Sequence, residues 1–184
     1  MYGGSTRKVS VLRLGHRRDR DKRITSHLGL TARAFGADEV ILSGDKDTSA
    51  LETWDSVTRR FGGRFTSRYE SKPIKFLKDL SESQEVTIVH LTMYGEPWRE
   101  AISLIPDDKP VMVVVGGTKV PTEVFQISHV NISVGNQPHS EVSALAVFLD
   151  SWIGPVDESS RFTGGRIKVQ PSARNKKVIN EREE

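Results

Sequence analysis

Runs of β-branched and aliphatic residues alternate along this chain with segments of helical spacing, and this alternation constrains its fold more than any other feature. The run at 111–115 contains only valine and methionine, and the lack of polar alternation is typical of a strand buried on both faces. The stretches 28–35 and 142–149 instead repeat along one helical face at i, i+3, i+4 and i+7. We therefore expect an α/β fold with a parallel sheet and right-handed crossovers. The predicted strands are Val9 to Leu14, Glu39 to Ser43, Val86 to Leu91, Val111 to Val115 and Val130 to Val134.

A turn signal at Gly154-Pro155 predicts a boundary late in the chain. We assign residues 1–153 to the parallel-sheet domain and residues 154–184 to a C-terminal appendage. Within this appendage, the sequence from Phe162 to Val169 predicts a short hairpin about a Gly164-Gly165 turn. The rest of the appendage is polar and basic, which predicts a mobile tail.

Composition excludes several classes of function. The chain contains no cysteine, which rules out disulfides, thiolate metal sites and every mechanism with a cysteine nucleophile. No apolar run approaches the roughly 18 to 20 residues that cross a bilayer, and the N-terminus lacks the apolar centre of a signal peptide. We therefore expect a cytoplasmic protein. The five histidines show no metal-ligand spacing, so we expect no metal site.

The formal charge of +3 conceals a separation of charge along the sequence. Nine basic and two acidic residues lie between Arg7 and Arg33, whereas the stretch 34–160 holds eleven basic and nineteen acidic residues. Clustered arginines without interleaved aromatic residues favour a protein that reads the backbone and shape of RNA. The alternative is a solvated loop in which aspartates neutralise some of the arginines.

Three glycine-containing loops follow predicted strands, where parallel sheets bind their ligands. They are Leu91 to Gly95, Gly116 to Pro121 and Gly135 to Ser140. Because glycine lets a ligand approach the backbone closely, the three loops together predict a shared small-molecule site. Taken singly, each can be an ordinary tight turn. The chain has neither G-x-G-x-x-G after the first strand nor the spacing of a P-loop, which disfavours hydride transfer and nucleotide hydrolysis.

Five distinctive segments occur in order along the chain. They are LRLGHR with RDKR (12–17 and 20–23), LTARAFGA (30–37), VHLTMYG (89–95), GGTKVP (116–121) and ISVGNQPHSEV (132–142). In this combination, residues 8–152 resemble the archaeal tRNA cytidine-56 2′-O-methyltransferases of the SPOUT class. The part after Gly154 matches less distinctly.

The resemblance implies a C-terminal trefoil knot, S-adenosylmethionine as cofactor, tRNA as substrate and a homodimer. It implies attack of a ribose 2′-hydroxyl on the methyl group of the cofactor. The absence of cysteine agrees, because methylation of cytosine at carbon 5 ordinarily needs a thiolate. The implied cofactor-binding residues lie in the three loops: Leu91, Gly116, Gly117, Thr118, Lys119, Val120, Ile132, Ser133, Val134, Gly135, Asn136, Gln137, Pro138 and His139.

The catalytic residues depart from the pattern of related ribose methyltransferases, which carry an Asn and an Arg where this chain has Ile24 and Leu30. Arg23 and His27 lie on one helical face near these positions and are the expected substitutes. Arginine is a poor base, so we expect Arg23 to orient phosphate or the 2′-oxygen and neutral His27 to accept the proton. For His27 the alternative is a packing role. Arg20 and Arg33 are second catalytic choices, and the expected RNA contacts are Arg17, Arg18, Arg20 and Arg33.

Other functions remain open on the sequence. One is a non-catalytic RNA-binding protein, and another is a base methyltransferase of the same fold. The latter needs a carboxylate near the transferred methyl group, and the nearest acids, Glu123 and Glu141, stand only at the edges of the loops. A third is a small-molecule enzyme unrelated to RNA.

Overall fold

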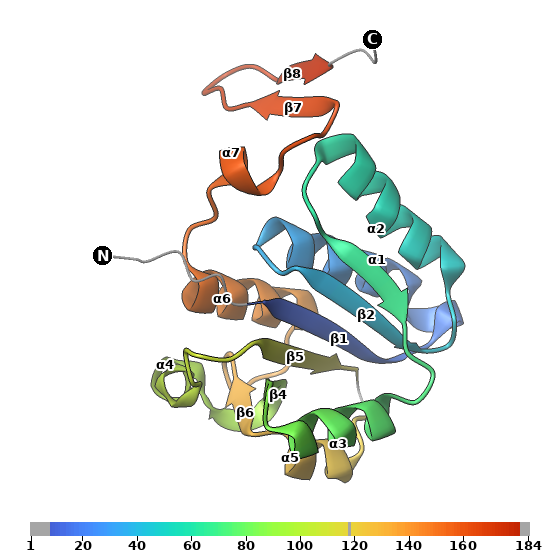
Figure 1. Ribbon diagram of the computed structural model, residues 1–184, viewed down its shortest axis with the longest axis vertical. Coiled ribbons are helices and arrows are strands. Elements are labelled where there is room, and N and C mark those ends of the chain that lie inside the picture. Colours follow the sequence, from blue (N-terminus) through green and yellow to red (C-terminus); the bar gives the residue numbers. More distant parts are fainter. Residues whose placement is uncertain (1–7, 118, 181–184) are drawn as a thin grey trace.

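The computed structural model describes residues 8–117 and 119–180. Its strands are β1 (Val9–His16), β2 (Glu39–Gly44), β3 (Thr66–Tyr69), β4 (Thr87–Pro97), β5 (Val111–Gly116), β6 (Val130–Ser133), β7 (Ile167–Gln170) and β8 (Lys177–Asn180). Its helices are α1 (Arg18–Ala34), α2 (Thr48–Phe61), α3 (Pro73–Ser83), α4 (Trp98–Ala101), a 3-10 turn (Ile102–Leu104), α5 (Thr122–Ile127), α6 (Glu141–Ile153) and α7 (Glu158–Arg161). Within these residues, the first six strands form one parallel sheet in the order β3-β2-β1-β5-β4-β6, and β7 pairs with β8 (Figure 1).

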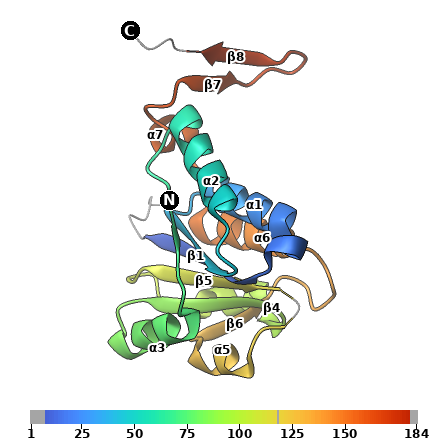
Figure 2. The same cartoon turned by 90° about the vertical axis from the view of Figure 1, so that its right-hand side faces the viewer.

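Helices cover both faces of this sheet (Figure 2). On one face, α1, α2 and α6 bury Leu28, Trp54 and Phe148, and on the other face α3 and α5 bury Leu77 and Val124. Strand β5 lies between β1 and β4 and is buried along its whole length. The prediction of a parallel α/β sheet with a fully buried central strand is therefore confirmed.

The ends of α6 are fixed by local chemistry. Ser140 precedes the helix, and its side chain accepts a hydrogen bond from the backbone N–H of Val142, as N-cap residues do. The helix ends at Gly154, whose φ of +81° suits a residue without a Cβ. Glu141 is thereby held in the first turn of α6, directly after the loop that leaves β6.

Two sequence-based expectations differ from the structure. Strand β3 was not expected, because it is a four-residue edge strand without a buried run. The hairpin about Gly164-Gly165 is wrong, since the antiparallel ribbon pairs Ile167 with Asn180 and its loop spans residues 171–176. Gly165 instead packs against the backbone of Phe61 and Gly62, too closely for a side chain. Strand β8 also occupies part of the expected tail.

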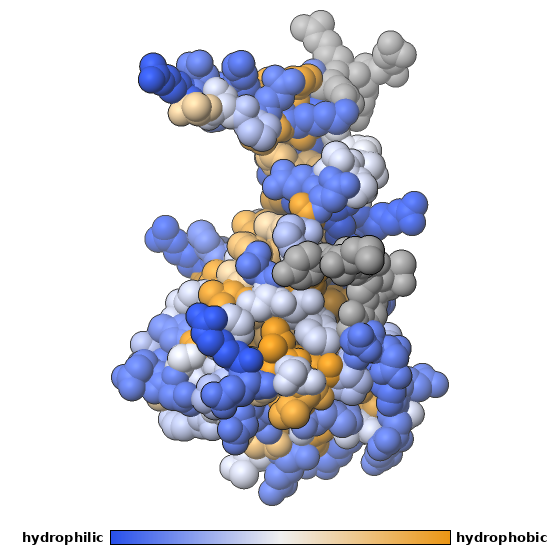
Figure 3. All heavy atoms as spheres, turned by 90° about the vertical axis from the view of Figure 1, so that its left-hand side faces the viewer, coloured by the Kyte–Doolittle hydropathy of each residue, from blue (hydrophilic) through white to orange (hydrophobic). Residues whose placement is uncertain are grey.

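The segment between α6 and the ribbon is tied to the sheet domain through Arg161. Its Nη2 donates to the carbonyls of Gly36 and Ala37 at 2.6 and 2.8 Å and pairs with Asp38 at 2.9 Å. Figure 3 shows the molecule narrowing between the main body and the ribbon. The long chain separation between Arg161 and its partners explains why the sequence alone gave no sign of this anchor.

Candidate active site

The loops that follow β4, β5 and β6 meet at one edge of the sheet and enclose a cavity of about 400 Å³. Eight of the expected cofactor-binding residues line it: Leu91, Gly116, Gly117, Lys119, Val120, Gln137, Pro138 and His139. Five others, at 132–136, directly precede lining residues in the sequence but do not themselves line the cavity. Thr118 lies outside the described residues. Parallel strands end at the same edge of a sheet, which is why segments so distant in sequence converge here.

The loop after β5 owes its shape to two adjacent glycines with different surroundings. A Cβ at Gly116 would collide with the side chain of Val120, so the loop can fold back on itself only with glycine at this position. A Cβ at Gly117 would lie 3.8 Å from Nη2 of Arg13 and 4.0 Å from Oε1 of Glu141, which are ordinary contact distances. Gly117 therefore leaves open space in the cavity beside a charged pair.

The loops after β4 and β6 hold one another in place. In β4 the register shifts, so that both Leu91 and Glu96 align with Ile132. The residues between them bulge from the strand, and Nδ2 of Asn136 donates to the carbonyls of Met93 and Gly95 at 2.9 and 3.0 Å. Asn136 thus fixes the geometry of two loops without lining the cavity itself.

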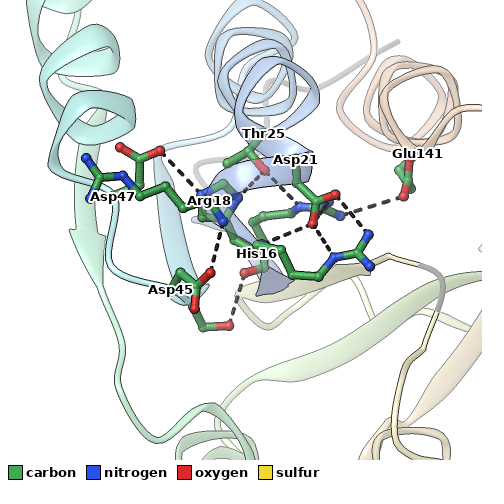
Figure 4. Close-up of polar contacts among 10 residues, drawn as sticks. His16, Arg18, Asp21, Thr25, Asp45, Asp47 and Glu141 are labelled. Carbon is green, nitrogen blue, oxygen red and sulfur yellow. Dashed lines mark hydrogen bonds and ion pairs between the residues drawn. The ribbon is translucent and has the colours of Figure 1, made fainter.

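A buried arginine stands behind the cavity wall formed by α6. Arg13, on β1, is 1% exposed, and its Nε donates to Oγ1 of Thr25 at 3.2 Å. Its two terminal nitrogens lie 3.8 Å from carboxylate oxygens of Asp21 and Glu141. Burial lowers the pKa of Arg13, and the two carboxylates oppose that effect. Figure 4 shows Glu141 reaching from α6 toward this polar cluster beneath α1.

The cluster continues away from the cavity to Asp47. Nδ1 of His16 lies 2.9 Å from Oγ1 of Thr25, and Nε2 of His16 lies 3.4 Å from Oδ2 of Asp47. Burial acts to raise the pKa of Asp47, but hydrogen bonds from the backbone N–H groups of Ala50 and Ser49, together with the nearby His16, hold it below the usual value. Asp47 is also the N-cap of α2. The cluster therefore fixes β1, α1 and α2 relative to one another.

On the opposite side of the sheet, His90 contributes to the cavity floor. Its Nδ1 lies 2.9 Å from Oδ1 of Asn131, and its ring meets that of Phe125 edge to face at 4.7 Å. Nδ2 of Asn131 donates to the carbonyl of Phe125 at 3.0 Å, which orients Oδ1 as the acceptor from His90. Burial lowers the pKa of His90, so the ring is neutral near pH 7.

The expected catalytic residues occupy a different part of the molecule. Arg20, Arg23 and His27 lie on α1, are exposed, and are not among the described residues that line the cavity. Arg18 is also exposed, and Arg17 is bound to Asp21 through two side-chain hydrogen bonds of 3.0 and 3.1 Å. These contacts leave the outer face of α1 basic.

Arg33 does not fit the expected roles in catalysis or RNA contact. It is 8% exposed, its Nη2 donates to the carbonyl of Gly62 at 2.6 Å, and its guanidinium lies over the ring of Phe162. It therefore fastens α1 to the end of α2 and to the C-terminal segment. The helical spacing gave a hint, because Arg33 follows Ala32, Leu28 and Gly29 on the inward face.

Sequence reasoning passed over Arg13 and gave Glu141 only an edge position. The signal for Arg13 was a charged residue inside an otherwise apolar strand, because such residues are rarely buried without a partner. Glu141 carried no such signal, since its place beside Arg13 arises only when β1 and α6 approach in three dimensions.

Among residues 8–117 and 119–180, no group of three or more His, Cys, Asp or Glu side chains is arranged to hold a metal ion. In the same residues, no helix has both the length and the apolar character that a bilayer crossing requires.

Several solved structures share this fold. A putative RNA methyltransferase of the TrmH family from Porphyromonas gingivalis superposes with a TM-score of 0.63 at 17% identity, over 79% of this chain and 59% of that one. The TrmH/SpoU tRNA modifying enzyme from A. aeolicus gives a TM-score of 0.60 at 14% identity, over 87% and 82%. At these identities the likeness concerns the fold alone.

Sequence relatives are much closer. A tRNA (cytidine(56)-2′-O)-methyltransferase from Methanopyrus kandleri is 48% identical over 93% of this chain and 96% of its own length. One from Archaeoglobus fulgidus is 48% identical over 95% and 99%. The family model described as tRNA ribose 2′-O-methyltransferase, aTrm56, matches residues 61–179. This chain belongs to that family of tRNA ribose 2′-O-methyltransferases.

Proposed function

We propose that this protein transfers the methyl group of S-adenosylmethionine to the ribose 2′-oxygen of cytidine 56 in tRNA. The observation that carries the proposal is the cavity that the loops after β4, β5 and β6 enclose, in a chain of this family. The relatives are named for the same reaction.

The cavity suits the proposed cofactor. Its volume of about 400 Å³ lies within the range of small-molecule sites. The space at Gly117, which a larger side chain would fill, and the backbone groups of the loops after β5 and β6 provide room and polar contacts. The related fold of the methyltransferase AviRb was solved in complex with AdoMet, which supports the same choice of cofactor.

The residues of this chain have three tasks in such a reaction. When bound, S-adenosylmethionine supplies a methyl group on a positively charged sulfur. The loops after β4, β5 and β6 would hold it in the cavity that Gly117 and Glu141 line. The ribose hydroxyl must then be positioned and relieved of its proton, which is general acid–base catalysis by a placed side chain.

The basic face of α1 is the proposed contact for tRNA. Arg18, Arg20, Lys22 and Arg23 are exposed along its first turns, and Arg17 adds charge at its start. Arginine forks bind phosphate in a bidentate manner, so this face suits an RNA backbone. We keep Arg23 as the residue that orients phosphate or the 2′-oxygen.

A homodimer reconciles the position of Arg23 with a role in methyl transfer. Because Arg23 does not line the cavity among the described residues, its action at the reacting atoms requires a second copy of the chain. We further infer a trefoil knot. The path of the chain after β5 supports this inference. From β5, in the middle of the sheet, the chain crosses one face through α5 and reaches β6 at the edge. It then continues as α6, which packs against α1 on the other face.

The test is incubation of the protein with methyl-labelled S-adenosylmethionine and tRNA, followed by digestion to nucleosides. Label in 2′-O-methylcytidine from position 56 is the expected result. Label in a base indicates a base methyltransferase, and tight tRNA binding without label indicates a non-catalytic RNA-binding protein.

A mixed-dimer experiment tests the shared site. Arg23→Ala and Gly117→Val chains are each expected to be inactive alone. Mixed and re-equilibrated, they recover activity if one dimer half supplies the cofactor pocket and the other supplies Arg23. No recovery, with exchange of subunits shown independently, means that the site lies within one chain.

A further inference from the structure

Transfer of a methyl group to a hydroxyl oxygen releases a proton, and the residues around the cavity limit which group can accept it. The titratable side chains among its described lining residues are His90, Tyr94, Lys119, His139 and Glu141. A lysine ammonium and a tyrosine phenol are proton donors rather than acceptors near neutral pH. The two histidines and the glutamate remain.

Neither histidine is placed as well as the glutamate. His90 borders the cavity floor, but the residue is 0% exposed. Its Nδ1 is bonded to Asn131, and its Nε2 has no hydrogen-bond partner among the described residues but is itself buried, so a ribose oxygen does not reach the ring in this structure. His139 has Nε2 against the carbonyl of Val134 and Nδ1 within 3.2 Å of Oγ of Ser143. Among the described residues of one chain that line the cavity, the remaining acceptor is the carboxylate of Glu141, whose side chain is 29% exposed.

Arg13 holds this carboxylate from behind. Nη1 of Arg13 is buried and has no hydrogen-bond partner among the described residues, and Oε1 of Glu141 lies 3.8 Å away. Asp21 is the other nearby acid, but it is already bound to Arg17 through both of its oxygens. A buried guanidinium needs a nearby negative charge, so Glu141 is held with one oxygen toward Arg13.

The same pair borders the open space at Gly117. A Cβ there would lie within 4.0 Å of both charged groups, and glycine leaves that volume free. Ser140 caps α6 and fixes the backbone of the following residue. A ribose oxygen entering the cavity can therefore approach Glu141 while Arg13 stays covered.

We propose that Glu141 is the catalytic base of methyl transfer and that Arg13 is the residue that positions it. The proposal rests on the function proposed above and replaces His27 as the proton acceptor. A bond forms between the 2′-oxygen and the methyl carbon as the carbon–sulfur bond breaks. The electron pair of that bond leaves with the neutral thioether, and the hydroxyl proton passes to Glu141 and then to water.

The decisive variant is Glu141→Gln, which keeps the shape of the side chain and removes its basicity. We expect kcat at saturating cofactor and tRNA to fall by about 100-fold or more. We expect the Kd for S-adenosylmethionine, measured by calorimetry, to stay within about twofold of the wild-type value. The reason is that the lost proton acceptor acts in the transition state and not in binding of the cofactor. The matched control is Glu123→Gln, since Glu123 also lies in the first turn of a helix after a glycine loop but pairs with Lys78 outside the cavity.

Other outcomes overturn the proposal. Wild-type kcat in Glu141→Gln means that another group takes the proton. A weakened cofactor Kd with unchanged kcat means that Glu141 binds the ammonium group of the cofactor instead. If the wild-type protein forms no 2′-O-methylcytidine, the proposed function fails and takes this inference with it. If the wild type is active and the variant equally so, only the inference fails.

Arg13→Lys tests the positioning role, with circular dichroism as a check on folding. Lysine keeps the buried charge but cannot contact Thr25 and Glu141 together as the planar fork does. We expect kcat to fall about tenfold while KM for tRNA is unchanged. The double variant Arg13→Lys with Glu141→Gln should be no slower than Glu141→Gln alone, because the two residues act as one unit. Additive losses would assign Arg13 a separate role.

Discussion

The wall of the cavity and the outer face of α1 differ in how firmly neighbouring groups hold their side chains. In the wall and directly behind it, Glu141, Arg13 and Asn136 are held by ion pairs and hydrogen bonds. On the outer face, the side chains of Arg23 and His27 are exposed and form no hydrogen bond or ion pair within the described part of the chain. A small ligand of fixed shape is bound best by groups already in place, whereas an RNA backbone is met by long charged side chains that adjust on contact.

The largest effect is expected from a substitution that fills open space in the cavity. In Gly117→Val, a branched side chain enters the space beside Arg13 and Glu141, so we expect cofactor affinity to fall by about 100-fold or more by calorimetry. Gly117→Ala adds one carbon at contact distance and should show a smaller loss, with an unchanged circular dichroism spectrum in both variants. Unaltered binding by the valine variant would contradict the placement of the cofactor.

The second prediction addresses the outer face of α1. Arg23→Ala should lower turnover by about 100-fold while the cofactor Kd remains nearly intact, because Arg23 is not part of the cavity wall among the described residues. Parallel measurements of single-turnover rate and calorimetric Kd separate the two quantities. Equal losses in both would make Arg23 a structural residue and remove the contrast between the regions.

Rising salt should weaken the binding of tRNA more than the binding of the cofactor. We expect tRNA affinity to fall at least about tenfold between about 50 and 200 mM salt, with a slope reduced by about one in Arg20→Ala. Cofactor affinity should change little over that range, because the contacts proposed for it are largely backbone groups. Fluorescence anisotropy with tRNA and calorimetry with cofactor give the two curves. Salt-independent tRNA binding would point to a small-molecule enzyme.

The smallest effect concerns Asp47, at the end of the buried polar cluster that also contains Arg13, Thr25 and His16. Because the folded-state pKa of Asp47 lies below its usual value, its contribution to stability is present above the unfolded pKa of about 3.9 and is lost as pH falls through the folded value. Asp47→Asn keeps a competent N-cap but should lower the free energy of unfolding by about 1 kcal/mol at pH 7.

The acid dependence of stability is the sharper readout of that variant. Urea titrations between about pH 5 and 3 should show a shallower decline in Asp47→Asn than in the wild type. Asp108→Asn, in an exposed turn, should follow the wild-type curve. A parallel decline in all three proteins would mean that Asp47 does not support the wall in this way.

Much of the fold was open to prediction because its signals are local. The uninterrupted valines of β5 and the helical repeat in α6 each report burial within a few residues. Strand β3 and the ribbon of β7 and β8 were missed or misplaced, because their pairing depends on neighbours rather than on an apolar run. The three loops were predictable for a related reason, since each follows a strand and parallel strands end together.

The sequence by itself determined the parallel α/β class, the order of the strands along the chain and the loops that meet at one edge. Only the tertiary structure decided which charges act together. Arg13 and Glu141 are separated by most of the chain, yet Nη1 of Arg13 lies 3.8 Å from Oε1 of Glu141. Arg33, which the sequence predicts as an RNA contact, is instead buried and donates to the carbonyl of Gly62. The reason is physical: periodicity records the face on which a residue lies, and only the packing of α1 against both β1 and α6 sets its partner.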